Sequence, residues 1–116
     1  MTERHEVSSS TARPGRVAPV FAALGDRTRL QLLRRLSTEG QVSIALLTSG
    51  TDITRQAITK HLHVLADAGL VKGTRRGRER LWELDPAQLE RARRYLEFMS
   101  ERWDDALARL KASVER

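Results

Sequence analysis

The sequence contains no cysteine among its 116 residues. Disulfide bonds, thiolate metal sites and cysteine nucleophiles are therefore excluded. It also lacks the run of about 20 apolar residues that a membrane-spanning helix needs, and its first residues have none of the apolar character of a secretory signal. We therefore expect a soluble, cytoplasmic protein that does not enter a membrane.

Patterns that carry catalysis or bind metal are also missing. There is no Ser-His-Asp constellation and no Gly-rich phosphate loop, and Asp104 and Asp105 are adjacent rather than convergent. His61 and His63 are two residues apart on an expected helix, so their side chains point to different sides and do not form a chelating pair. We expect no enzymatic activity, no cofactor and no metal ion.

Positive charge is present in excess and is concentrated in one part of the chain. The formal net charge is +6. Residues 53–80 contain seven Lys or Arg and two acidic residues, a net charge of +5, whereas residues 85–116 contain equal numbers of the two signs. A concentrated basic segment is typical of proteins that bind phosphate groups of nucleic acid.

The chain is expected to form one domain, residues 17–116, preceded by a polar arm, residues 1–16. The arm has a Ser/Thr cluster, a Pro-Gly pair and no apolar periodicity, which is typical of an unstructured segment. It either contacts DNA through Arg13 or Arg16 or has no role.

Apolar periodicity and capping signals predict about five helices and a two-stranded β-hairpin, a mainly α fold of the α+β class. The expected helices span residues 17–24, 27–38, 44–48, 54–68 and 86–116, and the strand-like runs span 70–72 and 80–84. Asp26 and Ser43 are expected N-caps, Val42 an isolated strand contact, and the apolar stripe of the second helix runs from Leu30 to Leu36. The third and fourth helices form a helix-turn-helix candidate with the hairpin as its wing.

The fourth helix, residues 54–68, carries side chains that are typical of a DNA-recognition helix. With Ile58, Leu62 and Leu65 turned to the core, the solvent-facing set is Gln56, Thr59, Lys60 and His63, with Arg55 at the flank. Arg and Gln side chains can make paired hydrogen bonds to base edges in the major groove, and Thr can contact base or phosphate. The alternative is an ordinary solvated helix face.

The hairpin has a basic tip. Arg75, Arg76, Arg78 and Arg80 surround Gly77, and like charges this close repel one another without a polyanion. A wing lying along the minor groove would use these arginines, and the alternative is a loop that is merely soluble.

The last helix carries an apolar stripe that a domain of this size cannot cover completely. Its members recur at helical spacing and are Leu89, Leu96, Met99, Trp103, Leu107, Leu110 and Val114. We expect part of the stripe to pack on the first helix and part to mediate self-association, which would place two reading helices about one DNA turn apart.

Three segments resemble the ArsR-type winged helix-turn-helix regulators, and together they indicate the family over nearly all of residues 17–116. Residues 22–30 (AALGDRTRL) are similar to the family's entry into its second helix, and residues 53–70 (ITRQAITKHLHVLADAGL) to its DNA-reading segment. Residues 77–84 resemble the wing.

The resemblance implies a homodimeric repressor that binds a double-stranded operator. Its dimer interface would include Val20 and Phe21 of the first helix together with the last helix. The implied DNA-binding residues are the cap Thr54, then Arg55, Gln56, Ala57, Thr59, Lys60 and His61, and Arg76 and Arg78 of the wing. Metal-responsive members carry a cysteine pair where this chain has residues 46–48 (LLT), and this chain also lacks histidines on its last helix, which places it in the metal-independent branch.

Two other functions compete with this interpretation. In one, the domain is a protein-interaction module whose stripe, including Met99 and Trp103, binds a different protein. In the other, the protein senses a small apolar ligand at the dimer interface.

The concentrated charge predicts that DNA binding weakens steeply with salt. Each phosphate neutralised by a residue such as Lys60, Arg76 or Arg78 should contribute about 0.9 to the slope of log affinity against log salt concentration. Binding measured over a series of salt concentrations tests this, and a flat dependence would contradict DNA binding.

Overall fold

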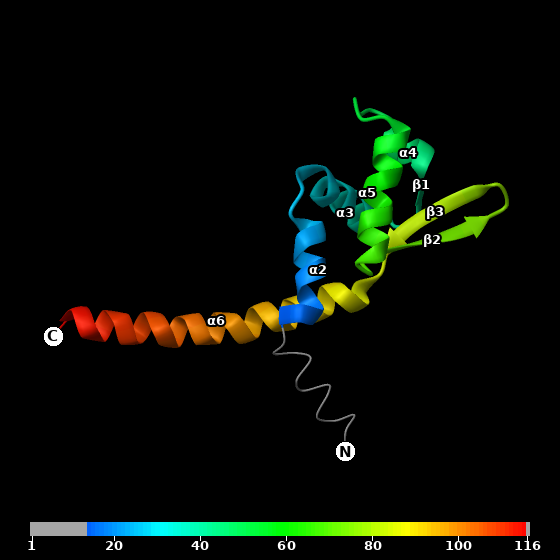
Figure 1. The fold of residues 1–116 in the computed structure, drawn as a ribbon. Helices are drawn as coiled ribbons and strands as arrows, with labels where there is room; N and C mark the ends of the chain where they lie inside the picture. The colour runs from blue at the N-terminus through cyan, green and yellow to red at the C-terminus, as the bar shows by residue number, and fades with distance from the viewer. Residues whose placement is uncertain (1–13, 116) are drawn as a thin grey trace, which may run out of the picture.

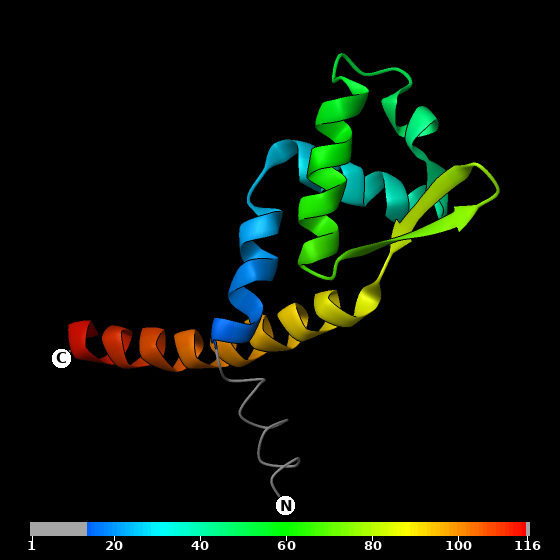
Figure 2. The ribbon, with the colours of Figure 1, turned by 45° about the vertical axis from the view of Figure 1, so that its right-hand side comes forward.

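The computed structural model describes residues 14–115 and forms a winged helix-turn-helix, which confirms the predicted mainly α fold (Figure 1). The helices are α2 (Pro14–Leu24), α3 (Arg27–Glu39), α4 (Ile44–Thr48), α5 (Arg55–Asp67) and α6 (Pro86–Glu115), and the strands are β1 (Val42–Ser43), β2 (Val71–Arg76) and β3 (Glu79–Leu84). Helices α2 to α5 and the sheet form the body. Helix α6 passes beneath the body, and its C-terminal half extends beyond it (Figures 1 and 2).

The sheet has three antiparallel strands in the order β1-β3-β2, where the sequence predicted a two-stranded hairpin. Val42 pairs with Trp82, so the isolated contact expected at Val42 is a short strand that anchors the hairpin to the body. The strands of the hairpin are longer than predicted because Arg76 pairs directly with Glu79, which leaves a two-residue turn.

The N-terminal boundary also differs from the prediction. Helix α2 begins at Pro14, inside the segment expected to be the arm. Residues 1–13, and with them the suggested DNA contact at Arg13, lie outside the described residues, as does the side chain of Arg16.

Side-chain caps set the starts of three helices. Asp26, Ser43 and Thr54 each accept a hydrogen bond from the backbone N–H three residues later, at the starts of α3, α4 and α5. Each bond satisfies a donor that the first helical turn leaves unpaired. The predicted caps are confirmed. The side chain of Thr54, the residue immediately before α5, therefore defines where α5 begins.

The core lies between α3, α5 and the sheet. Ile58, Leu62 and Leu65 on α5 are at most 1% exposed, and Trp82 of β3 is buried against them. Full burial of such a side chain stabilises the fold by about 1.5–3 kcal/mol. The prediction for α3 was partly wrong: Leu30 is half exposed, because the buried face of this helix is formed by Leu32, Leu33 and Leu36.

Only the N-terminal half of α6 packs on the body. Ala92 is buried, Leu89 packs against the core, and the ring of Tyr95 lies 6.1 Å from that of Phe21 on α2. From residue 100 to residue 115 every side chain is exposed. The second half of α6 therefore has no cover within the described part of the protomer.

The end of α5 yields a stability prediction at Gly69. Its φ is +79°, and a Cβ there would lie 2.6 Å from Cγ of Gln88. Gly69→Ala should lower the free energy of unfolding by about 1–2 kcal/mol, because an L-residue is strained in the left-handed region. Urea unfolding measures the change.

Gly25→Ala is the matched control, because Gly25 has no positive φ and its nearest contact would be the Ala22 carbonyl oxygen at 3.4 Å. This variant should be as stable as the wild type or slightly more stable. Equal losses at both glycines would contradict the conformational argument.

Candidate nucleic-acid interface

Helix α5 presents a polar face on the side opposite its buried apolar residues. Thr54, Arg55, Gln56, Lys60 and His63 are exposed, and α5 stands beside the β2–β3 hairpin (Figures 1 and 2). The structure therefore brings together most of the side chains that the sequence assigned to DNA contact.

Two of the residues predicted to contact DNA from α5 are less accessible than the others. Ala57 is half-buried, and Thr59 is half-buried with its hydroxyl donating to the Arg55 carbonyl at 2.8 Å. The outward surface of the helix consequently depends on its longer side chains, which are Arg55, Gln56, Lys60 and His63.

His61 lies at the junction of α2, α3 and α5 rather than on the outward face. Its Nδ1 is 3.3 Å from Nη1 of Arg29 and 3.8 Å from Oδ2 of Asp26, and its side chain is 24% exposed. Arg29 also donates to the Ala23 carbonyl at 2.6 Å. The ring is thus positioned among groups of its own protomer, and we leave His61 out of the candidate interface.

The same junction perturbs the carboxyl of Asp26. The backbone N–H of Arg29 donates to this carboxylate at 3.0 Å, which lowers the pKa of Asp26 below its usual value, and the charges of Arg29 and His61 act in the same direction. The ionised cap therefore stabilises the start of α3.

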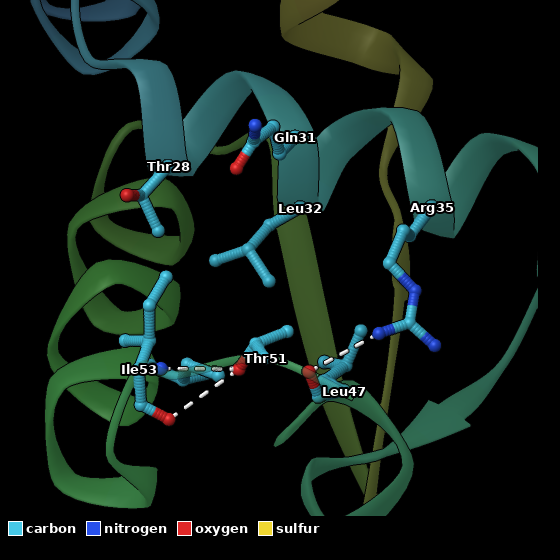
Figure 3. A pocket seen from close by; sticks show the side chains of 8 residues that line it. Thr28, Gln31, Leu32, Arg35, Leu47, Thr51 and Ile53 are labelled. Atoms are coloured by element: carbon cyan, nitrogen blue, oxygen red, sulfur yellow. Dashed lines mark hydrogen bonds between the residues drawn. The ribbon is translucent and has the colours of Figure 1, made fainter. Parts of the chain in front are cut away.

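A small cavity lies under the segment that leads into α5 (Figure 3). It has a volume of about 180 Å³, and its lining residues are Thr28, Gln31, Leu32, Arg35, Leu47, Thr51, Ile53 and Ile58. At its edge, the Thr51 hydroxyl accepts from the backbone N–H of Ile53 at 3.3 Å. This bond shapes the turn immediately before the Thr54 cap.

Arg35 joins α3 to α4 at the other edge of the cavity. Its guanidinium donates to the Leu47 carbonyl at 3.1 Å (Figure 3) and to the Leu46 carbonyl at 3.3 Å, at the end of α4. It also pairs with Glu39 at 2.8 Å, and this hydrogen bond raises the pKa of Arg35 and lowers that of Glu39. Arg35 therefore holds the two helices that precede α5 at a defined distance.

The wing carries four exposed arginines around a tight turn. Gly77 has a φ of +63° at the first position of the two-residue turn, as a type II′ hairpin requires. The predicted residues Arg75, Arg76 and Arg78 are all exposed, and so is Arg80. The basic tip predicted from the sequence includes Arg80, but the family resemblance implies only Arg76 and Arg78 as wing contacts. Side chains of a strand alternate between its two faces, so Arg80 lies on the same face as the buried Trp82. This alternation is the sequence signal that could have identified Arg80 as a site residue.

The predicted dimer residues differ in how much of each side chain is exposed. Val20 is 1% exposed and belongs to the core of the protomer, which leaves almost none of its side chain for contact with a partner, and Phe21 and Leu89 are also packed against that core. Met99 is half-buried. Leu96, Trp103, Leu107 and Leu110 are 46–62% exposed on α6.

Within residues 14–115, no three His, Asp or Glu side chains are grouped so that they could hold a metal ion. None of the described helices combines the length and the apolar character that crossing a membrane requires.

Known proteins resemble this chain in sequence and in structure. A protein family described as "Helix-turn-helix domain" matches residues 24–74. The uncharacterized HTH-type transcriptional regulator YuzN of Bacillus subtilis is 46% identical over 68 residues, covering 53% of this chain and 74% of YuzN. An ArsR-like transcriptional regulator from Rhodococcus sp. RHA1 superposes with a TM-score of 0.77 at 37% identity, covering 88% of this chain and 93% of its own.

A more distant structure shares the fold. The homodimeric winged helix-turn-helix DNA-binding domain of Mb0332 from Mycobacterium bovis has a TM-score of 0.60 at 24% identity, covering 74% of this chain and 77% of that chain.

The Asp26 cap generates a prediction about pH. A carboxyl whose pKa is lowered by folding contributes stability above its unfolded pKa and loses that contribution as the pH falls through the folded value. The free energy of unfolding of the wild type should therefore decrease relative to that of Asp26→Asn as the pH is lowered from about 7 to about 3, since Asn caps a helix without titrating.

Urea unfolding at a series of pH values measures the difference between the two proteins. Asp105→Asn, at an exposed position on α6, is the control and should leave the pH profile of the wild type unchanged. A stability difference between wild type and Asp26→Asn that does not vary with pH would show that the carboxylate charge has no part in the cap.

Proposed function

The chain belongs to the ArsR family of winged helix-turn-helix transcriptional regulators, and we propose that it is a homodimeric repressor of a two-fold symmetric operator in duplex DNA. In this proposal α5 enters the major groove and the wing lies against the neighbouring backbone and minor groove. The observation that supports it most directly is the exposed set Arg55, Gln56 and Lys60 on a helix whose opposite face is fully buried.

The positions of these side chains along α5 suit different parts of DNA. Arg55 and Gln56 occupy the first turn, after the Thr54 cap, where a reading helix contacts base edges. Gln56 can make paired hydrogen bonds to an adenine, and Arg55 to a guanine. Lys60 lies about one turn further on and provides a positive charge for phosphate, which sets the position of the helix without reading sequence.

The exposed part of α6 supports the homodimer. Leu89, Leu96, Trp103 and Leu110 recur at intervals of seven residues, the spacing that forms a continuous seam between two helices. Three of the four are about half exposed or more in the protomer. A second copy would cover these three residues and would place two copies of α5 on one side of the assembly. Mb0332, which shares the fold, is described as homodimeric.

The regulatory chemistry that we propose does not use thiolate metal ligands, because the chain has no cysteine. Repression follows if the operator overlaps a promoter, since the bound dimer then excludes RNA polymerase.

Selection of genomic fragments by the purified full chain, followed by footprinting, tests the proposal. Enrichment of a two-fold symmetric site protected by a dimer is the expected result. Failure to enrich any site would overturn the proposal.

Gln56→Ala should reduce discrimination at one base position of each half-site by about 1–3 kcal/mol while leaving the other positions unchanged. Binding to a set of operators that differ at single base pairs measures this effect. Lys60→Ala is the comparison, because loss of a phosphate contact weakens binding to all sequences by a similar factor. A uniform loss in Gln56→Ala would contradict base reading by Gln56.

Trp103→Ala should weaken dimerisation by about 30-fold, which corresponds to about 2 kcal/mol for a central aromatic of an interface. Its DNA affinity should fall as a consequence. Sedimentation equilibrium and fluorescence anisotropy measure the two quantities. Glu101→Ala is the control, because Glu101 lies on the same helix two residues before the seam position and should change neither. A Trp103→Ala protein that remains a dimer would contradict this seam.

A further inference from the structure

The two faces of the wing differ in charge. Because residues directly opposite each other on paired strands share a face, Arg75 and Arg80 lie together on the face that also carries Trp82. On the other face, Arg76 is opposite Glu79, and Lys72 is opposite Glu83, with 3.9 Å between Lys72 Nζ and Glu83 Oε1. The face with Arg75 and Arg80 therefore concentrates positive charge, whereas on the other face each basic residue lies opposite an acidic one.

The pair formed by Arg75 and Arg80 is unfavourable as it stands. Like charges directly opposite one another destabilise a sheet, and within residues 14–115 neither guanidinium forms an ion pair. Together with Arg78 of the turn, these two residues line a hollow of about 240 Å³. A hollow lined by arginines suits an oxyanion, because guanidinium groups bind phosphate oxygens in pairs.

Arg80 is held in place on this face. Its guanidinium carbon lies 5.4 Å from the centre of the Trp82 ring, and the ring itself is buried. Opposite Trp82 stands Gly73, where an added Cβ would lie 3.1 Å from Nε of Arg80 and 3.3 Å from Cζ3 of Trp82. Because Gly73 has no side chain, Arg80 can occupy the space beside it. Arg80 is already held against the Trp82 ring, so it loses less conformational entropy when it binds a ligand.

The face of the wing that carries Trp82 also contacts α5, the proposed recognition helix. The ring of His63 on α5 lies 6.0 Å from the ring of Trp82. The hollow and the polar face of α5 are therefore linked through one buried side chain, and DNA bound to α5 would pass beside the hollow.

We propose that Arg75, Arg78 and Arg80 form a binding site for one phosphodiester group of the DNA backbone, and that Arg76 on the opposite face is not part of it. This inference rests on the proposed function and makes it more specific. It adds Arg75 and Arg80 to the wing contacts that the family resemblance implied and removes Arg76 from them. Gly73 is a positioning residue, because it acts through the placement of Arg80.

Arg80→Ala and Arg76→Ala test the proposal as a matched pair, since each removes one positive charge from an exposed position of the hairpin. Arg80→Ala should lower DNA affinity by about tenfold and reduce the salt slope by about 0.9. Arg76→Ala should leave the slope unchanged. Equal losses in the two variants would show that only the total charge of the wing matters and would overturn the proposal.

Gly73→Ala provides a second test that leaves the net charge constant. It should displace Arg80 from Trp82 and lower DNA affinity, and Arg80→Lys should behave similarly because the ammonium lacks the guanidinium fork. Circular dichroism and thermal unfolding check that both variants are folded. Wild-type affinity in both folded variants would overturn the role of a positioned guanidinium.

Nuclear magnetic resonance of the Arg80 Nε–Hε group identifies the source of the phosphate. Its signal should shift on addition of operator DNA and not on addition of inorganic phosphate at equal ionic strength. Binding of inorganic phosphate with an affinity comparable to that of DNA would assign the hollow to a free anion and overturn the backbone assignment. If wild-type protein binds no DNA at all, the proposed function fails, whereas DNA binding with equal effects at Arg76 and Arg80 refutes the phosphate site alone.

Discussion

The orientation of α5 depends on the burial of its apolar face, and the candidate interface depends on that orientation. Ile58, Leu62 and Leu65 are removed from water almost completely. Rotating the helix to bury any other set would expose these side chains and place polar groups in the core, at a cost of several kcal/mol. Arg55 and Lys60 consequently project outward, so the chemistry offered to DNA is set by the packing beneath it.

Trp82 has a comparable role for the wing. It pairs with Val42 across the sheet, fills space in the core and supports the guanidinium of Arg80. One residue therefore connects the body of the domain to the hairpin and brings the hairpin beside α5. A wing without this buried anchor would be an isolated hairpin, which has little stability in water.

Several features were predictable because they depend on neighbours in the sequence. The caps Asp26, Ser43 and Thr54 act on backbone groups three residues away. The boundaries of α3, α4 and α5 follow from apolar repeats and glycines over similar distances, whereas the start of α2 at Pro14 was not predicted. The positions of His61 and Val20 were not predictable in this way, because the first depends on Arg29 from another helix and the second on how α2 sits against the core.

The sequence alone determined the order of the helices, the basic composition of the hairpin and the residue types on the outward face of α5, since these follow from local periodicity and from charge. Only the tertiary structure decided which arginines share a face of the wing. The reason is that strand register sets which residues lie opposite each other, and pairing Arg75 with Arg80 rather than with Glu79 requires a two-residue turn at Gly77. It also decided that half of α6 remains uncovered, because that depends on the length of α6 relative to the body on which it packs.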